Sequence, residues 1–450
     1  MSDQILAAFA HRGVDLLQAE DPALYQLFDR EYRRQNDTLA MIAASSLADP
    51  STLACEGMVV GNVTAEGYPG ARYHAGCQFV DDIERLAIER AQAAFRAQYA
   101  NVQPHSGTTA NEIVMFALLE PGATILGLDL DSGGHLSHGA TASVSGKYFK
   151  AVGYGLNHEG FIDYDRAARL AREFRPRLVI CGASAYPRII DFERFRDIAD
   201  EVGAYLLADI SHIAGLVVAG EHPSSIDHAH FTTTSTYKQL YGPRGGLILI
   251  GKDSQSLSPD GKRTLPEMIQ RAVFPFFQGT PNLNAIGAKA RALAIVSAPE
   301  FKRLAKRIVT DARALARRLA DMGYKVLTGG SDNHLVLIDV LASGVTGFVA
   351  ERALEECGII VNKNRIAGDR KSSLVTSGLR LGTNSLALRG MDGDDMPQCA
   401  DLIDHVLSSV KVIGDREYEL EKDVRQVVQT RVKELCRRFP IPRYPIEVKW

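Results

Sequence analysis

The residues best able to carry chemistry in this chain are Lys238 and Asp209. Lys238 stands between the threonine-rich residues 231–236 and the turn GPRGG. Asp209 ends the apolar run AYLLA, so we expect it at the carboxyl end of a buried parallel strand, where ligands of open α/β sheets bind. A buried carboxylate needs a cation, and the protonated ring nitrogen of pyridoxal phosphate is one. Because a lysine can hold the aldehyde of this cofactor as a Schiff base, the two residues predict a pyridoxal phosphate site.

Ser106 and Gly107 mark a second position suited to that cofactor. They belong to the segment PHSGTTAN, which precedes the apolar, helix-periodic residues 113–119. The unpaired N–H groups and the positive dipole at a helix start bind anions, so this segment could hold a phosphate. Ser106 could also be an ordinary helix N-cap. In combination with Lys238, phosphate binding is the favoured interpretation.

Three further residues could act at the same site. His135, in a glycine-rich loop, could stack on a flat cofactor ring and move protons near the substrate, or it could simply pack; His138 is expected only to pack. Glu66 lies beside a tight turn, where most glutamates are merely solvated. Arg380 lies in an apolar strand and needs an anion, either a substrate carboxylate or a structural salt-bridge partner.

The elements that position these residues follow an α/β pattern. Short apolar runs alternate with amphipathic segments from about residue 51 to 295, which predicts a largely parallel sheet. We expect a helical arm at 1–50 that lies on a neighbouring subunit, a cofactor-binding large domain at 51–300, and a smaller α+β domain at 301–450. The sequence predicts apolar strands at 123–128, 178–182, 205–208, 246–250 and 335–338, a surface loop at 251–266, a bridging helix at 299–322 and an amphipathic segment at 418–438.

The composition is that of an ordinary folded protein of 450 residues, with 46% hydrophobic and 23% charged residues. A formal net charge of −3 without a basic run argues against nucleic acid as a partner. The six cysteines show no CxxC pair and no metal-ligand spacing, so we expect reduced thiols and no metal site. We find neither a membrane span nor a signal-peptide pattern, which predicts a cytoplasmic protein without membrane partners.

From about residue 40 to the carboxyl terminus, the chain strongly resembles the serine hydroxymethyltransferases. The resemblance implies a fold-type-I pyridoxal phosphate enzyme with a seven-stranded, mostly parallel sheet in its large domain. It also implies a reversible retro-aldol reaction, in which a β-hydroxy amino acid loses its hydroxymethyl carbon, usually to tetrahydrofolate. The motifs that carry it, all in one order, are AEGYPGARYHAGC, ANVQPHSGTTAN, GGHLSHG, GASAYPRIID, ADISHIAGL, YKQLYGPRGG and TSGLRLGTN.

Carried over residue by residue, the resemblance assigns the cofactor contacts. Lys238 becomes the Schiff-base lysine, Asp209 the partner of the ring nitrogen, and His135 the residue stacked on the ring. The remaining implied cofactor residues are Ser184 and His212 at the ring edge, Ser106, Gly107 and Ser235 at the phosphate, and Gly279 and Thr280 at the phosphate of the neighbouring subunit. A homodimer with shared active sites, possibly a tetramer, is therefore implied.

The resemblance also assigns the substrate contacts. Arg380 would grip the substrate α-carboxylate, and Glu66, from the partner chain, would be the acid/base that handles the hydroxymethyl oxygen or the folate. Positions that bind the pterin in the family are retained, which favours a folate-dependent transferase. They are Glu66, Tyr73, Leu136 and Asn364.

Five positions depart from the family pattern. Ala44 replaces a serine that normally helps hold the substrate carboxylate, and Thr64 replaces a tyrosine that normally enters the site. The other three changes are His74 for tyrosine, Tyr237 for histidine and Thr280 for glycine. Altered contacts of this kind shift discrimination between substrates by about 1–3 kcal/mol each.

The smaller residues Ala44 and Thr64 open space beside the reacting carbon, which suits a substituent on Cα. We therefore hypothesise a resemblance to the 2-methylserine hydroxymethyltransferase branch, with 2-methyl-L-serine and D-alanine as substrates, and with Tyr237 and His74 shaping the protonation of Cα. The alternatives are a glycine-forming serine hydroxymethyltransferase, a folate-independent threonine transaldolase or aldolase, and a catalytically silent binding paralogue.

Overall fold

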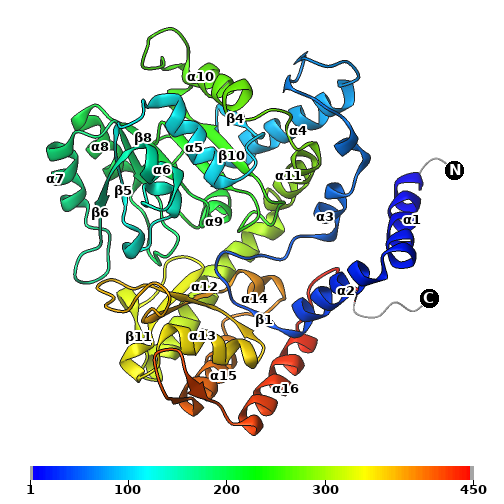
Figure 1. The fold of residues 1–450 in the computed structure, drawn as a ribbon, viewed down its shortest axis with the longest axis vertical. Helices are drawn as coiled ribbons and strands as arrows, with labels where there is room; N and C mark the ends of the chain where they lie inside the picture. Colours follow the sequence, from blue (N-terminus) through cyan, green and yellow to red (C-terminus); the bar gives the residue numbers. More distant parts are fainter. Residues whose placement is uncertain (1–3, 446–450) are drawn as a thin grey trace.

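A seven-stranded sheet forms the centre of the larger part of the molecule. The computed structural model describes residues 4–445 (Figure 1). Neighbouring strands from β6 to β9 run parallel, and β10 is antiparallel to both β9 and β4. The sheet is mostly parallel, as predicted. In spatial order its strands are β4 (Tyr99–Asn101), β10 (Gly246–Ile250), β9 (Phe231–Ser235), β8 (Tyr205–Asp209), β7 (Leu178–Cys181), β5 (Thr124–Leu128) and β6 (Lys150–Tyr154).

Successive residues of the central strands enter hydrophobic cores on opposite faces of this sheet. In β8, Leu206 and Ala208 belong to one core and Leu207 to the other, which follows from the two-residue period of a strand. Helices therefore cover both faces. The first face carries α4 (Gln78–Phe95), α7 (Tyr164–Phe174), α8 (Phe192–Val202), α9 (Ala214–Ala219) and α11 (Leu283–Val296), and the second carries α5 (Gly107–Leu118) and α10 (Leu265–Arg271).

The smaller α+β part contains a four-stranded antiparallel sheet with a hydrophobic core of its own. The spatial order of its strands is β11 (Lys325–Val326), β12 (Leu335–Asp339), β15 (Gly378–Gly382) and β14 (Asn362–Asn364). Helices that contribute to this core are α13 (Gly347–Glu356), α14 (Asn384–Leu388), α15 (Met396–Ser409) and α16 (Lys422–Arg438).

Two segments join the large and small parts. Helix α12 (Pro299–Asp321) contributes Phe301 to the core of the large part and Leu315 to that of the small part. Strand β1 (Leu39–Ala40) pairs in parallel with β13 (Ile359–Ile360), so the chain passes through the small part before it enters the large sheet. We retain the domain boundaries near residues 50 and 300 as a proposal.

The amphipathic pattern from residue 418 to 438 is only partly helical. Its first residues form β17 (Tyr418–Glu419), which pairs with β16 (Lys411–Val412), and α16 begins at Lys422. Side-chain spacing over so few residues does not distinguish a short strand from a helical turn, so the amphipathic pattern alone does not locate the start of the helix. The polar segment 251–266 contains a short 3-10 helix, η4 (Lys252–Gln255), before α10 begins.

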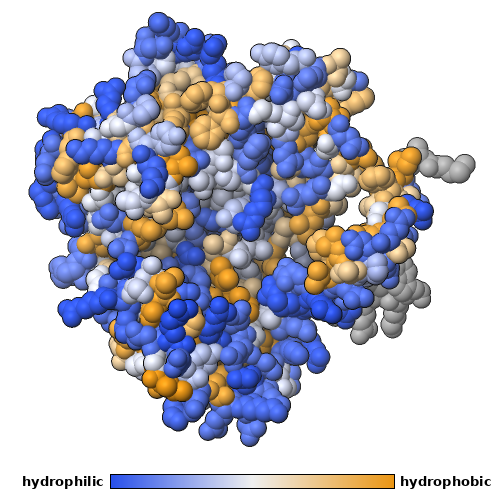
Figure 2. Space-filling model, in the orientation of Figure 1, coloured by the Kyte–Doolittle hydropathy of each residue, from blue (hydrophilic) through white to orange (hydrophobic). Residues whose placement is uncertain are grey.

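The amino-terminal helices extend away from the body on the side of α16 (Figure 1). They are α1 (Ile5–Glu20) and α2 (Pro22–Asp37). No residue of α1 is buried, and Figure 2 shows apolar side chains on this protruding part; Ile5 and Phe9 are among the exposed ones. The expected contact of this arm with a neighbouring subunit stays a prediction. Within residues 4–445, no helix is long and apolar enough to cross a membrane.

Candidate active site

Lys238 and Asp209 lie at the same edge of the large sheet. Asp209 is the last residue of β8, and Lys238 follows the parallel neighbour β9, so both lie beyond the carboxyl ends of parallel strands. Both are buried, with 8% of Asp209 and 7% of Lys238 exposed. This is the position that the sequence predicted for Asp209.

Burial lowers the pKa of the Lys238 ammonium to about 8, because the interior disfavours its charge. Asp209 opposes this effect, whereas the positive charges of Arg380 and Arg244 lower the pKa further. The neutral amine is the nucleophilic form of lysine. The site therefore makes Lys238 reactive near neutral pH.

Asp209 is kept ionised by a fixed set of donors. Burial alone would raise its pKa, but the hydrogen bond with His138 and the electrostatic influence of His138, His135 and the Lys238 ammonium together hold the pKa well below its usual range. Oδ2 accepts a hydrogen bond from Asn111 Nδ2 at 2.8 Å, and Oδ1 accepts one from the N–H of Ser211 at 3.0 Å. A buried carboxylate held in this way favours a cationic ring nitrogen as its ligand.

His138, expected only to pack, is a direct partner of Asp209. Its Nε2 lies 3.1 Å from Asp209 Oδ2, and its Nδ1 accepts the backbone N–H of His135 at 3.4 Å. Nδ1 is thus an acceptor, so Nε2 carries the proton that is donated to the carboxylate. Sequence reasoning also missed Asn111, although both residues lie in motifs that resemble the family.

His135 presents a neutral ring beside this carboxylate. Burial lowers the pKa of His135 to about 4, since the interior disfavours the imidazolium; Asp209 partly opposes this. Its Nδ1 accepts the N–H of Ser137 at 3.2 Å, which fixes the orientation of the ring. A neutral, fixed ring is suited to stacking on a flat cofactor.

His135, His138 and Asp209 also have the composition of a metal site. One ligand atom from each lies within 4.8 Å of the others. These atoms are already engaged with one another and with Ser137 by hydrogen bonds, and the three side chains follow the pattern of the cofactor site. We therefore assign no metal to them.

Ser235 Oγ and His212 Nδ1 are among the buried polar atoms near Lys238 that have no hydrogen-bond partner within the described residues. Buried polar groups are nearly always paired, so these atoms are free to contact a bound ligand. Ser235 was predicted to contact the cofactor phosphate and His212 the ring edge, and unpaired atoms at both positions fit pyridoxal phosphate.

The predicted phosphate-binding segment packs directly on Ser235. Ser106 is the N-cap of α5, and its Oγ accepts the N–H of Thr109 at 3.0 Å, so the alternative role considered from the sequence is also present. A Cβ on Gly107 would lie 3.1 Å from Ser235 Cβ and 3.3 Å from Ser211 Oγ. Glycine thus allows the helix start to approach this serine closely.

Arg380 reaches from the small part toward the large sheet. It lies on β15, where Nε donates to Asn362 Oδ1 at 3.0 Å and Nη1 donates to the carbonyl of Ser184. Burial lowers the pKa of Arg380 to about 10, and no ion pair of the described residues includes it. A partly buried guanidinium without a carboxylate partner is well suited to a substrate carboxylate.

A second cluster contains Glu66, Tyr73, His74 and Gly279. Glu66 Oε2 lies 3.4 Å from His74 Nε2, and a Cβ on Gly279 would lie 3.5 Å from Glu66 Oε1. Tyr73 is 73% exposed and packs its ring edgewise against Phe274. Within residues 4–445, no hydrogen bond or ion pair links this cluster to Lys238 or Asp209. Of these residues, Glu66 and Gly279 are the ones that the resemblance assigns to the active site of the neighbouring subunit.

The other predicted residues divide between the two clusters. Leu136 directly follows His135, and Asn364 precedes Arg365, whose Nη1 forms an ion pair with Asp131 Oδ1 at 2.8 Å in the same loop. Thr64 is exposed beside the second cluster, and Thr280 lines a cavity of about 270 Å³. The residues predicted to bind folate are therefore divided between the clusters as well.

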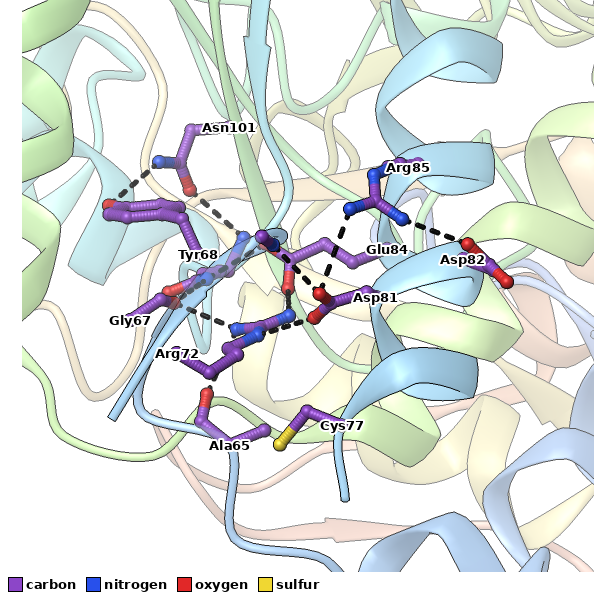
Figure 3. A network of polar contacts seen from close by, with 12 residues as sticks. Ala65, Gly67, Tyr68, Arg72, Cys77, Asp81, Asp82, Glu84, Arg85 and Asn101 are labelled. Atoms are coloured by element: carbon purple, nitrogen blue, oxygen red, sulfur yellow. Dashed lines mark hydrogen bonds and ion pairs between the residues drawn. The ribbon is translucent and has the colours of Figure 1, made fainter. Parts of the chain in front are cut away.

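Arg72 anchors the hairpin that presents Glu66 (Figure 3). The hairpin pairs β2 (Gly67–Tyr68) with β3 (Ala71–Arg72). The Arg72 side chain is 3% exposed and forms ion pairs with Asp81 at 2.8 Å and Glu84 at 2.5 Å. It also donates to the carbonyls of residues 65 and 67 on either side of Glu66, which fixes this backbone.

Fold and site together define an α/β enzyme of the fold-type-I pyridoxal phosphate class. The sequence model of the family described as "Serine hydroxymethyltransferase" matches residues 17–403. The chain belongs to this family. The family uses pyridoxal phosphate as cofactor and tetrahydrofolate as co-substrate, and the chain is accordingly a pyridoxal phosphate-dependent hydroxymethyltransferase.

The lowered pKa of Lys238 predicts how the cofactor-free protein takes up pyridoxal phosphate. The uptake rate should increase with pH, with a midpoint at about 8, and level off only well above that pH, where the neutral amine predominates. Stopped-flow absorbance measures this rate. In Arg380→Met the midpoint should move to higher pH, since a neighbouring positive charge is removed. A wild-type rate that still increases near the ordinary lysine value of 10.5 would contradict the assignment.

Removing Arg72 should strongly destabilise the protein. Arg72→Met leaves two buried carboxylates without their cation, which typically costs about 3–5 kcal/mol. Urea unfolding monitored by circular dichroism measures the change. The matched control is Arg172→Met, because Arg172 pairs with exposed Glu201 at 3.0 Å and should contribute less than about 1 kcal/mol. Equal losses in the two variants would disprove a special role for Arg72.

Proposed function

We propose that this enzyme transfers the hydroxymethyl group of 2-methyl-L-serine to tetrahydrofolate and releases D-alanine. The observation that supports this most is the position of Ala44. The N–H of Gly382, two residues beyond Arg380, donates to the carbonyl of Met41 at 2.7 Å, and Ser46 Oγ donates to the carbonyl of Tyr237 at 2.6 Å. Ala44 thus lies between the strand of Arg380 and the loop of Lys238.

The alanine at this position removes a hydroxyl and leaves space. By resemblance, family members carry a serine here that helps to hold the substrate carboxylate. With alanine, Arg380 has to hold the carboxylate with less help. We expect the freed volume to lie beside the carboxylate and Cα of a substrate bound by Arg380, which is where a 2-methyl group would be placed.

The residues of the two clusters would divide the work of the reaction. When bound, pyridoxal phosphate supplies a ring that withdraws electrons from the substrate α-carbon. Asp209 would hold a proton on the ring nitrogen, and Arg380 would orient the substrate through its carboxylate. Glu66 of the neighbouring subunit would accept the proton of the substrate hydroxyl while the Cα–Cβ bond breaks, and tetrahydrofolate would take up the one-carbon unit.

Two of the departures are placed to influence how Cα is protonated. The ring of Tyr237, next to Lys238, carries the guanidinium of Arg244 on its face at 3.8 Å. His74 lies beside Glu66 in the other cluster. In an assembled dimer, we expect the two side chains to approach the substrate from different subunits.

Three alternatives remain distinct in their products. A glycine-forming enzyme would convert serine and tetrahydrofolate, and a threonine-type aldolase would release acetaldehyde without folate. A silent binding paralogue would do neither, and the buried Lys238, Asp209 and Arg380 argue against it.

Incubation of the purified enzyme with D-alanine and methylene-tetrahydrofolate should yield 2-methylserine, detected by chiral chromatography and mass spectrometry. The double variant Ala44→Ser/Thr64→Tyr should shift the ratio of kcat/KM values toward glycine by about tenfold or more, because it restores contacts and fills space. Absence of 2-methylserine would end the proposal, and faster formation of serine from glycine would favour the ordinary transferase.

The division into two clusters predicts complementation between inactive subunits. Glu66→Gln and Lys238→Ala should each abolish activity. After the two variants are mixed and allowed to exchange subunits, a heterodimer with shared sites contains one intact site, so about a quarter of the wild-type activity should return. Size-exclusion chromatography verifies the dimer. No recovery despite subunit exchange would show that each chain forms its own complete site.

A further inference from the structure

Lys289 is a buried lysine that the catalytic assignments leave unexplained. It lies on α11, is 2% exposed, and donates to three backbone carbonyls: Val102 at 2.6 Å, Pro104 at 3.0 Å and Gly246 at 3.0 Å. An ammonium has three donors, so all are used. No ion pair of the described residues includes it, and Glu84, the acid that influences it, is bound to Arg72 and Gln103. Such a charge is costly to bury.

The three carbonyls belong to two segments that meet at the predicted phosphate site. Val102 and Pro104 lie just before Ser106, and Gly246 begins β10, after the loop that contains Lys238. The N–H of Gly246 donates to the carbonyl of Pro104 at 2.9 Å. Lys289 therefore links residues 102–104, which precede the start of α5, to strand β10, which follows the loop of Lys238.

Where these two segments meet, Gly245 and Gly246 have no room for a side chain. A Cβ on Gly245 would lie 2.3 Å from Lys289 Cε, and a Cβ on Gly246 would lie 2.3 Å from the carbonyl oxygen of Ser106. The two glycines of the GPRGG turn thus permit the approach of the ammonium and of the phosphate segment. The position of Ser106 therefore depends on the contact of Gly246 and Lys289 with the segment that precedes α5.

Gln278 holds the same approach segment from another direction. Its Nε2 donates to the carbonyl of Gln103 at 3.1 Å, and its Oε1 accepts the N–H of His105 at 3.1 Å. Gln278 directly precedes Gly279 and Thr280, which the resemblance assigns to the phosphate of the neighbouring subunit. The segment 102–105 is therefore clamped between Lys289 and that loop.

We propose that Lys289 is a positioning residue of the cofactor site: its ammonium fixes the start of α5 against Ser235, so that the phosphate-binding groups keep their spacing. It touches neither cofactor nor substrate and acts through the backbone of residues 102–107. This inference rests on the phosphate site proposed above, in which Ser106, Gly107 and Ser235 hold the phosphate.

The test compares Lys289→Met with wild type in two measurements on the full-length protein. Amide hydrogen exchange of residues 102–107 in the cofactor-free protein should be faster by about tenfold, because three charge-assisted hydrogen bonds are lost. The dissociation constant for pyridoxal phosphate, from fluorescence titration, should increase by about tenfold or more. Lys289→Gln retains two donors, so its exchange rate and its dissociation constant should lie between those of wild type and Lys289→Met. If Lys289→Met does not fold, Lys289→Gln takes its place in the comparison.

Two control variants distinguish this positioning role from a general loss of stability and from a direct contact with the phosphate. Lys302→Met, at an exposed lysine, should change neither measurement. Ser235→Ala should weaken pyridoxal phosphate binding without changing exchange at 102–107. Unchanged exchange and affinity in both Lys289 variants would overturn the proposal, as would lower thermal stability with unchanged affinity. Unchanged affinity in Ser235→Ala would instead contradict the phosphate site itself.

Discussion

The buried negative charge of Asp209 is the constraint on which the rest of the active site depends. The carboxylate stays ionised because Asn111, Ser211 and His138 donate hydrogen bonds to it. An ionised group in the interior is stable only beside positive charge or strong donors, so the surrounding groups must supply both. The electrostatics of the site are thereby set before any ligand binds, and they favour a cation at the ring nitrogen position.

Three cations that are wholly or partly buried complete this arrangement: Lys238, Arg380 and Lys289. The cost of burying the charge is offset in a different way for each of them. Lys238 has a lowered pKa and becomes a nucleophile, whereas Arg380 donates to Asn362 and Ser184 and retains capacity for an anion. Lys289 satisfies all three donors with backbone carbonyls. The same physical cost therefore yields a reactive group, a binding group and, in our proposal, a positioning group.

The second cluster follows a different design. Tyr73 is exposed and Glu66 is partly exposed. The buried ion pairs of Arg72 with Asp81 and Glu84 support the hairpin next to them (Figure 3). A rigid support under exposed polar groups is suited to delivering them to another molecule. This arrangement is consistent with our proposal that the Glu66 cluster of one subunit completes the Lys238 site of another.

Several interactions could not be predicted from local patterns. His138 was expected only to pack, and Asn111 received no role, because each meets Asp209 across a large separation in sequence. The amphipathic pattern of residues 418–438 did not show where α16 begins, because a short strand and a helical turn have similar side-chain spacing. Lys289 gave no signal, since nothing in its neighbourhood along the chain indicates that it points into carbonyl oxygens.

The sequence by itself determined the chemical groups and the parallel sheet that carries them, because apolar runs and covalent order decide which residues end each strand. That is why Asp209 could be placed at the carboxyl end of a strand in advance. Tertiary structure alone decided which buried polar atoms meet: Arg380 with Ser184, and Lys289 with Val102, Pro104 and Gly246. The reason is physical, since burial forces each polar group to find a partner, and that partner is chosen by how distant segments pack.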